Sequence, residues 1–587
     1  MRRRTAVAAV AVGTALALVL GACGKSGNTD KNTDNNASPT YNAAVGKVFN
    51  PSTKKGGTIR YGFTDDWDSL DPGDTYYGYS WDFVRYYGRS LVMFKPGAGA
   101  DTNQLVPDLA ESLGKPSDDA KTWTYTLRKG LKFEDGTPIT SKDVKYAVER
   151  SLDKDTFPNG PTYFNDFLDL QGYTTVAADT DPDKLGLKAI ETPDDNTIVF
   201  HLKTSFSGFD YFAMLPSTIP VPRAKDTGTK YKEHVVSSGP YMFDSYVAGQ
   251  SFSLKRNPNW DPATDPYRAA LPDRIEVKLK MNAEDLDKQL QNGTIDVDVA
   301  GTGVLPATQA TLLANDTNKK NVDVAALARL WFTTLNSDVA PLDNIDCRKA
   351  ILYASDHESY LKAYGGDAGG KIATTLLPPQ IPGAPKTDPY GFLDKPNGDV
   401  DKAKAALASC GHPDGFSINI SYRSDRPKEQ SVAEGLQQSL AKVGIKLTLK
   451  GYPTGDYTKL YAGKPEYAKA NNIGMSVYGW GADWTDGFGF LQQIVDSRVI
   501  RASGNTNLGV KDPAVDALID QALTTTDATA RNAIWGQVDT KVMDDAFVLP
   551  GVWASVVLYR SPNLTNVGIS DGLGGFYDYV QLGVKQS

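Results

Sequence analysis

The residues that most often carry out catalysis are spread widely along this chain. Its four histidines lie at positions 201, 234, 357 and 412, and none belongs to a His-Glu-x-x-His or Cys-x-x-Cys pattern. No Gly-x-Ser-x-Gly sequence, which would place a serine nucleophile on a sharp turn, occurs. Residues Gly365 to Lys371 are close to a phosphate-binding loop, but Ile372 replaces the hydroxyl residue that would hold magnesium. The sequence therefore predicts no catalytic, metal or cofactor site.

Aspartates are the side chains here that could bind a charged ligand. Several lie between Asp65 and Asp74 with a spacing that approaches a calcium loop, but Leu70 stands where an oxygen ligand is needed. We therefore interpret this stretch as a solvated acidic turn. Asp483 and Asp486 offer the carboxylate pair that a hydrolase would need. They are three residues apart at the end of an expected strand, so they should point in different directions.

The elements that would position these side chains alternate between strands and helices. Residues 275–299 are expected to form a strand, a helix that Gly293 ends, and a second strand. Residues 416–449 should repeat this order around a helix at 427–443, with Gly444 as its C-terminal stop. Such strand–helix–strand units imply partly parallel sheets covered by helices. The predicted fold class is therefore α/β.

Length and charge exclude several classes of protein. The chain has 587 residues, a formal net charge of −8 and a pI of about 5.3. This length suits about three or four folding units. The acidic balance argues against nucleic acid as a partner. No stretch after residue 22 is apolar enough to span a bilayer, which excludes a multi-span membrane protein.

Residues 1–22 are predicted to be a signal peptide. Three arginines at positions 2–4 precede an apolar segment, residues 5–20, that is shorter than the roughly 20 residues of a membrane-spanning helix. Leu20-Gly21-Ala22-Cys23 resembles the lipobox of bacterial lipoproteins, in which Cys23 is acylated and becomes the first residue. Residues 23–56 would form a flexible tether. We expect lipid anchoring at the outer face of the bacterial cytoplasmic membrane; an ordinary signal peptide with an incidental cysteine is the alternative.

The other two cysteines form an even pair once Cys23 is acylated. Disulfides form and persist outside the cytoplasm, so the export signal makes a bond between Cys347 and Cys410 the expected state. Two buried free thiols are the alternative.

Several segments resemble the family of bacterial extracellular solute-binding proteins that serve peptide and nickel ABC importers. The most specific is Leu109–Ser112 followed by residues 122–150, TWTYTLRKGLKFEDGTPITSKDVKYAVER. Further matching segments occur in family order at Asp68–Pro72, Ser238–Tyr241, Arg256–Trp260, Asn292–Asp296 and Gly479–Asp483. The resemblance extends from about Gly57 to near the C-terminus.

This resemblance implies a two-lobed, periplasmic-binding-protein-like fold, type II and cluster C-like, with an extra inserted domain. Lobe 1 (domain I) would consist of residues 57–90, 195–299 and 550–587, domain II would be inserted at 91–194, and lobe 2 (domain III) would cover 300–549. The chain would cross between the lobes near residues 299–301 and 549–551. Such a body is expected to be a monomer that docks on ABC permease subunits.

The resemblance also implies a ligand that is enclosed between the lobes as an added strand. In peptide-binding members an acidic side chain pairs with the α-amino group of the ligand, and this position falls on Asp483, with Trp480 beside it. A buried ammonium group needs such a partner. Arg329 would bind a ligand carboxylate. The remaining expected contacts are Tyr76, Tyr77, Gly78, Tyr163, Trp331 and Phe332, with core packing as the alternative for the last two.

The function that the resemblance implies is capture of short peptides and their delivery to a permease, without enzymatic activity. The family also includes nickel, opine and oligosaccharide binders, so these solutes are alternatives. A secreted hydrolase is an alternative of a different class. A binding protein that supplies peptides to a signalling pathway would have the same sequence features as one that imports peptides as nutrients, so the sequence does not distinguish these two roles.

The lipobox interpretation predicts that Cys23→Ala abolishes lipidation, because acylation needs the thiol of Cys23. Metabolic labelling with a fatty acid and membrane fractionation would show unlabelled precursor or mislocalised protein. A native mature N-terminus that lies elsewhere and carries no acyl chain would contradict the interpretation.

Overall fold

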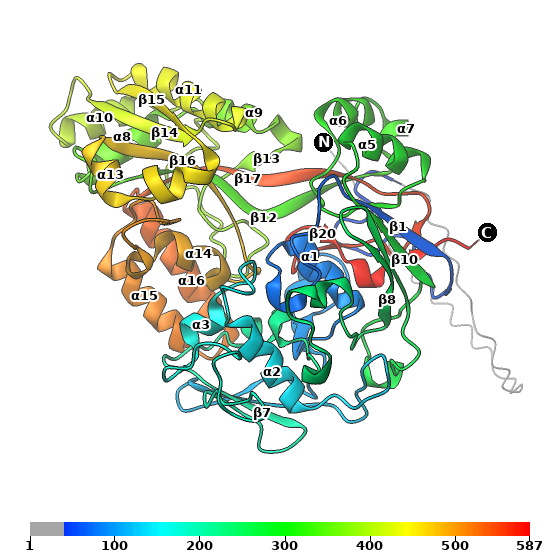
Figure 1. Ribbon diagram of the computed structural model, residues 1–587. Helices are drawn as coiled ribbons and strands as arrows, with labels where there is room; N and C mark the ends of the chain where they lie inside the picture. The colour runs from blue at the N-terminus through cyan, green and yellow to red at the C-terminus, as the bar shows by residue number, and fades with distance from the viewer. Residues whose placement is uncertain (1–39, 587) are drawn as a thin grey trace, which may run out of the picture.

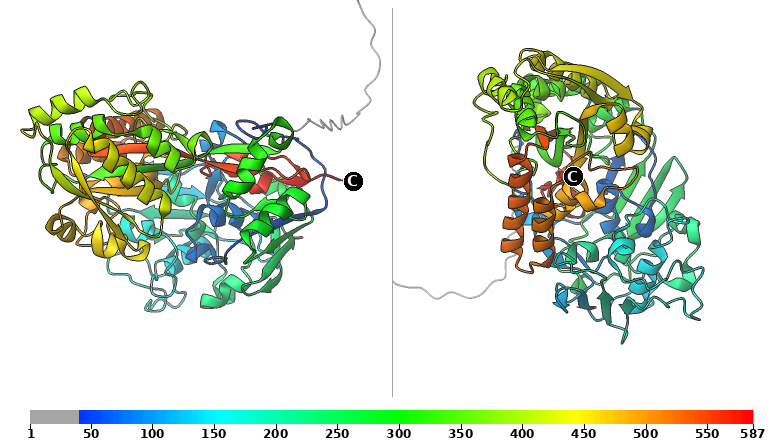
Figure 2. Two further views of the ribbon diagram at one scale, coloured as in Figure 1. Left: turned by 90° about the horizontal axis from the view of Figure 1, so that it is seen from above. Right: turned by 90° about the vertical axis from the view of Figure 1, so that its left-hand side faces the viewer.

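The computed structural model describes residues 40–586, so the predicted signal peptide, Cys23 and the start of the tether lie outside the described residues. Two halves lie side by side, and two long strands, β12 (Val322–Leu335) and β17 (Val548–Tyr559), run between them (Figure 1). In the view from above, the helices of residues 345–441 lie at one end and the C-terminus at the other (Figure 2). Within the described part, no helix combines the length and apolarity that crossing a membrane requires. The predicted α/β class and two-lobed fold are confirmed.

The first half is built on a five-stranded sheet with the strand order β11-β1-β10-β9-β8. Its strands are β1 (Thr58–Gly62), β8 (Tyr241–Val247), β9 (Ser251–Arg256), β10 (Arg274–Lys278) and β11 (Val297–Asp298). β1 is parallel to both β10 and β11, as the strand–helix–strand pattern predicts. The connecting helix, α5 (Ala283–Asn292), ends at Gly293 in the left-handed conformation, with φ 76°.

A four-stranded sheet with the order β4-β5-β7-β6 covers the lower side of this half (Figure 1). Its strands are β4 (Lys115–Ser117), β5 (Thr122–Thr126), β6 (Ile190–Glu191) and β7 (Thr197–His201), and α2 (Ser141–Ser151) and α3 (Tyr163–Phe167) accompany them. β7 pairs with β5 along its whole length. We expected domain II to end at residue 194, but this sheet continues to His201, because β7 pairs with β5 on the side opposite β4.

The second half contains a six-stranded sheet with the order β13-β17-β12-β16-β14-β15. Besides β12 and β17, its strands are β13 (Gly370–Ile372), β14 (Ser417–Arg423), β15 (Lys446–Tyr452) and β16 (Ile473–Gly481). In Figure 1 one group of helices lies above this sheet and another below it. The upper group is α8 (Ile345–Ala354), α9 (His357–Ala363), α10 (Val400–Ser409) and α11 (Pro427–Ala441), and the lower group is α14 (Gly487–Val495), α15 (Pro513–Thr524) and α16 (Ala528–Asp544).

β17 stays in this sheet beyond the crossing that we expected at residues 549–551. It pairs with β12 as far as Tyr559, which lies opposite Val322. The two strands therefore cross between the halves as one paired ribbon, and the change of half is spread along its length. The remaining elements are short: α1 (Gly78–Phe83), α4 (Asp210–Ala213), α6 (Pro306–Leu313), α7 (Asp316–Lys319), α12 (Thr454–Asp456), α13 (Pro465–Ala470), β2 (Val92–Phe94), β3 (Leu105–Pro107), β18 (Leu564–Thr565), β19 (Ile569–Ser570), β20 (Phe576–Tyr577) and β21 (Gly583–Val584).

Aromatic side chains of α3 and of the chain just after β7 join the first half to the second half. The ring of Phe488 in α14 lies 4.8 Å from that of Phe206 and 5.9 Å from that of Phe167, measured between centroids. Trp484, just before α14, lies 4.8 Å from the ring of Tyr163. These rings are at the separations at which aromatic pairs attract, so this contact holds the halves together on one side of the gap between them.

The predicted disulfide between Cys347 and Cys410 is present. Cys347 lies in α8 and is fully buried, and Cys410 caps the C-terminus of α10. The bond fixes these two packed helices to each other in the second half.

Replacing both cysteines with serine should lower the free energy of unfolding by about 2–4 kcal/mol, because the bond closes a long loop in the unfolded chain. Urea unfolding of the wild type and of the double variant, each with and without reductant, would measure the difference. Reductant should destabilise only the wild type. Equal stability of the two proteins under oxidising conditions, or two alkylatable thiols in the exported wild type, would contradict the bond's stabilising role.

Candidate functional site

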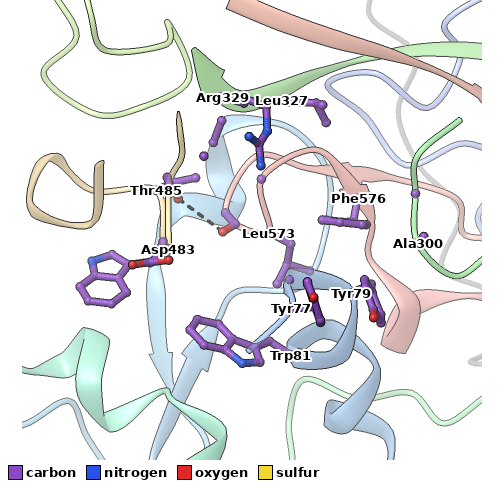
Figure 3. Close-up of a pocket in the computed structure, with 18 of the residues that line it drawn as sticks. Tyr77, Tyr79, Trp81, Ala300, Leu327, Arg329, Asp483, Thr485, Leu573 and Phe576 are labelled. Carbon is purple, nitrogen blue, oxygen red and sulfur yellow. Dashed lines mark hydrogen bonds between the residues drawn. The ribbon is translucent and has the colours of Figure 1, made fainter. Parts of the chain in front are cut away.

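A cavity of about 600 Å³ lies between the two halves (Figure 3). The first half lines it with residues of α1 and the chain around Phe94 and Leu573, and the second half with residues of β12, β17 and the end of β16. A volume of this size is typical of sites that enclose a small-molecule ligand.

Asp483 follows β16 and faces the cavity from one side (Figure 3). Its carboxylate accepts hydrogen bonds from the hydroxyl of Tyr76, at 2.9 Å, and from that of Tyr163. Burial raises the pKa of Asp483 to about 6, while these two hydrogen bonds favour the charged form. Tyr76 belongs to the first half and Tyr163 to the inserted segment, so one carboxylate connects three separate parts of the chain.

The segment that carries Tyr76 is anchored by Asp68. The Asp68 carboxylate accepts hydrogen bonds from the Thr75 hydroxyl at 2.8 Å, the Tyr76 backbone at 2.9 Å and the Ser80 hydroxyl at 3.2 Å. Nearby, Asp71 is buried and accepts hydrogen bonds of 2.6 and 3.0 Å from the Arg150 guanidinium. Our interpretation of these aspartates as a solvated acidic turn is therefore wrong for both, because each carboxylate satisfies donors inside the protein.

Aromatic side chains form the floor of the cavity in the first half. Tyr77, Tyr79, Trp81 and Phe576 all line it (Figure 3). The rings of Tyr77 and Tyr79 are stacked, with centroids 5.3 Å apart, and Tyr77 is 56% exposed. Gly78 begins α1 between them, and a Cβ there would lie 3.2 Å from the Phe576 ring. The predicted residues Tyr77 and Gly78 thus lie in the cavity, and Tyr77 contributes an exposed ring to it.

Arg329 and Trp331 face the cavity from β12, in the second half. They lie opposite Gly481 and Gly479 of β16. A Cβ at Gly479 would come within 2.1 Å of the Trp331 ring, and one at Gly481 within 2.9 Å of the Arg329 guanidinium. The two glycines of the Gly-Trp-Gly segment therefore leave the space that these side chains fill.

The Arg329 guanidinium lies 5.3 Å from the Trp331 ring centroid, and Trp331 stacks on Tyr364 at 4.7 Å. Among residues 40–586, Arg329 has no carboxylate partner. Burial, and then the nearby guanidinium groups of Arg423 and Arg426, lower the pKa of Arg329. A partly buried cation in such surroundings is well suited to bind an anionic group.

Phe332 does not line the cavity, contrary to our prediction. It is 2% exposed and packs edge-on against Tyr478 at 6.1 Å between centroids. Successive side chains of a strand point to opposite faces, so the orientation of Trp331 toward the cavity places Phe332 in the core.

Trp480, Tyr76 and Tyr163 line a second pocket of about 340 Å³ on the other side of the Asp483 carboxylate. The indole Nε1 of Trp480 is buried and has no hydrogen-bond partner within the described chain. Trp480, which we expected beside Asp483 as a ligand contact, thus lines this second pocket and not the main cavity. Asp486 also lies outside the main cavity, because its carboxylate caps α14 through the Phe488 N–H at 2.8 Å.

Several cavity residues were absent from the sequence-based predictions. They are Tyr79, Trp81, Tyr364, Lys428, Thr485 and Phe576. The alternation of aromatic residues in Tyr77-Gly78-Tyr79-Ser80-Trp81 was a signal that could have indicated the first two. Lys428 and Phe576 lie far from any segment that resembles the family's ligand contacts, so no sequence signal marked them.

Comparisons with known proteins agree with this architecture. Residues 104–501 match the model of "Bacterial extracellular solute-binding proteins, family 5 Middle". The chain is 28% identical to the "Probable D,D-dipeptide-binding periplasmic protein DdpA" of Escherichia coli (strain K12), over 82% of this chain and 85% of that protein. It is also 28% identical to "Heme-binding protein A" of Haemophilus influenzae, over 91% and 92%. The solved structure of "Clavulanic acid biosynthesis oligopeptide binding protein 2" is 39% identical, with a TM-score of 0.88 over 94% of this chain and 99% of that one.

The geometry predicts that Tyr163→Phe raises the pKa of Asp483 above its value of about 6, because the variant loses a hydrogen bond to the charged form. Because burial raises the pKa of Asp483, the contribution of this group to folding stability is greatest when it is protonated and is lost as the pH rises through about 6. Carboxyl ¹³C NMR titration would measure the pKa, with Asp483→Asn to assign the signal.

Tyr467→Phe is the matched control, because within the described part of the chain the Tyr467 hydroxyl has one hydrogen-bond partner, the Tyr452 hydroxyl at 3.5 Å. This variant should leave the titration of Asp483 unchanged. An unchanged or lower pKa in Tyr163→Phe would show that the hydroxyl does not hold the carboxylate.

Proposed function

The chain belongs to the bacterial extracellular solute-binding proteins of family 5, and we propose that it captures short peptides between its two lobes for an ABC importer. The energy for transport would come from the ATPase of the importer, and this chain would be a binding protein and not an enzyme. The oligopeptide-binding protein to which it is 39% identical supports a peptide as the ligand.

The observation that carries the proposal is the pair of opposite charges at the cavity. Asp483 would bind the α-amino group of the peptide, and Arg329 a carboxylate of the peptide. β12 and β16 are neighbours, with Arg329 opposite Gly481, and Asp483 lies two residues beyond the end of β16. A peptide with free ends carries the complementary charges, and each buried charge would gain a hydrogen-bonded partner.

The first half would complete the site. Tyr76 and Tyr163 would keep the Asp483 carboxylate in place, and Tyr77 and Trp331 would pack against the peptide backbone and side chains. Because Tyr77 belongs to the first half and Trp331 to the second, a ligand would contact both only when the halves meet. Binding would therefore favour the closed arrangement. The division into lobe 1, domain II and lobe 2 remains part of this proposal, with β7 assigned to domain II.

The cellular setting is also a proposal. A signal peptide at residues 1–22, an acylated Cys23 and the tether to residue 56 would hold a monomeric protein at the outer face of the cytoplasmic membrane. There it would meet ABC permease subunits in the same membrane. The alternative is that the protein delivers another solute to the same kind of importer: a nickel chelate, an opine, an oligosaccharide or heme.

The proposal predicts that peptide binding requires a free α-amino group and the charge of Asp483. Titration calorimetry with trialanine and N-acetyl-trialanine should show that Asp483→Asn costs roughly 2–5 kcal/mol of binding free energy for the free peptide. Acetylation should cost the wild type a similar amount and the variant much less, because the same interaction is already lost.

Asp571→Asn is the matched control. Asp571 is partly buried near the cavity but does not line it, so this variant should bind like the wild type. If the losses from acetylation and from Asp483→Asn simply add, Asp483 does not bind the amino group. If neither peptide binds the wild type, the peptide proposal fails.

A further inference from the structure

Among residues 40–586, four charged side chains line the cavity: Arg85, Arg329, Lys428 and Asp483. The charge of Arg85 is matched inside the first half, because its guanidinium donates hydrogen bonds of 2.9 Å to both Asp82 and Asp578. The carboxylate of Asp483 already accepts two tyrosine hydroxyls. The charges left for a ligand are therefore one carboxylate and two cations.

The two cations flank one aromatic stack. Arg329 lies 5.3 Å from the ring of Trp331, and the Lys428 ammonium lies 6.0 Å from the ring of Tyr364. Trp331 and Tyr364 are themselves stacked at 4.7 Å. Neither cation forms an ion pair within the described chain. Both cations thus lie beside the same aromatic stack, and neither has an anionic partner among the described residues.

The residues behind these cations do not balance them. Arg423 bonds to Glu429 at 2.8 and 3.0 Å, and Arg426 lies 4.0 Å from the same carboxylate. The single negative charge of Glu429 therefore faces two guanidinium groups. It does not neutralise Arg329 or Lys428 as well. This wall of the cavity carries an excess of positive charge.

We propose that the cavity selects peptides whose C-terminal residue is acidic, so that two carboxylates lie close together at this wall. The inference rests on the proposed peptide function. The planar guanidinium of Arg329 can bind the terminal carboxylate through two parallel hydrogen bonds, and the Lys428 ammonium acts as a point charge on the side-chain carboxylate. Arg329 lies near the Trp331 ring of this stack and Lys428 near its Tyr364 ring, so the two cations offer two anion positions.

The test uses three tripeptides with free ends: Ala-Ala-Glu, Ala-Ala-Gln and Ala-Ala-Lys. Lys428 lines the cavity but is exposed, so the charge pair that it adds is partly screened by solvent. Wild-type protein should therefore bind Ala-Ala-Glu about threefold more tightly than Ala-Ala-Gln, and Ala-Ala-Lys most weakly. Lys428→Gln should bring the ratio of the affinities for Ala-Ala-Glu and Ala-Ala-Gln close to one, because the variant lacks the charge that distinguishes the two peptides.

Lys442→Gln makes the same charge change at the other end of α11, where Lys442 is exposed, and it should keep the full preference. Equal affinity of the wild type for the three peptides, or an unchanged preference in Lys428→Gln, would overturn this inference while the peptide proposal stands. If none of the peptides binds, the peptide proposal fails, and this inference fails with it.

Discussion

A carboxylate removed from bulk water needs hydrogen-bond donors, and in this protein the donors to Asp483 come from the opposite side of the molecule. Tyr76 and Tyr163 reach it from two different segments, and Tyr163 also packs against the Trp484 ring of the second half at 4.8 Å. The backbone around Asp483 is held as well: the Ala482 N–H donates to Ala328 at 2.8 Å, and the Asp483 N–H to Gly489 at 3.1 Å. The shape of the cavity follows from this contact, because it sets how the two halves meet at one edge of the site.

The rest of the site depends on the register of one pair of strands. β12 and β16 pair with Arg329 opposite Gly481, and Asp483 follows two residues after the end of β16, so this register sets where the cation and the carboxylate stand relative to each other. The aromatic floor comes from the other half, where Asp68 fixes the chain between Thr75 and Ser80. The polar ends of a ligand would thus be recognised by one half and its body covered by the other. Such an arrangement suits a site that assembles when a ligand joins the two.

Local signals in the sequence were enough for much of the fold. Gly293 and Gly444 end their helices because only a residue that tolerates positive φ fits there, and both adopt it. The family resemblance placed Asp483 and Arg329 at the cavity, but it could not reveal that Tyr163, 320 residues away, donates to Asp483. Phe332 was predicted with Trp331 although adjacent residues of a strand face opposite ways. Lys428 was not predicted as a cavity residue, because its position there follows from the packing of α11 over the six-stranded sheet.

If this cavity holds a peptide by its charged ends, the ligand that the protein carries from its cell should be a peptide. Mass spectrometry of the small molecules released by gentle denaturation of the purified protein identifies that ligand directly. We expect a series of short peptides with free α-amino groups. An oligosaccharide, an opine, a nickel chelate or heme released in amounts equal to the protein would contradict a peptide-binding function.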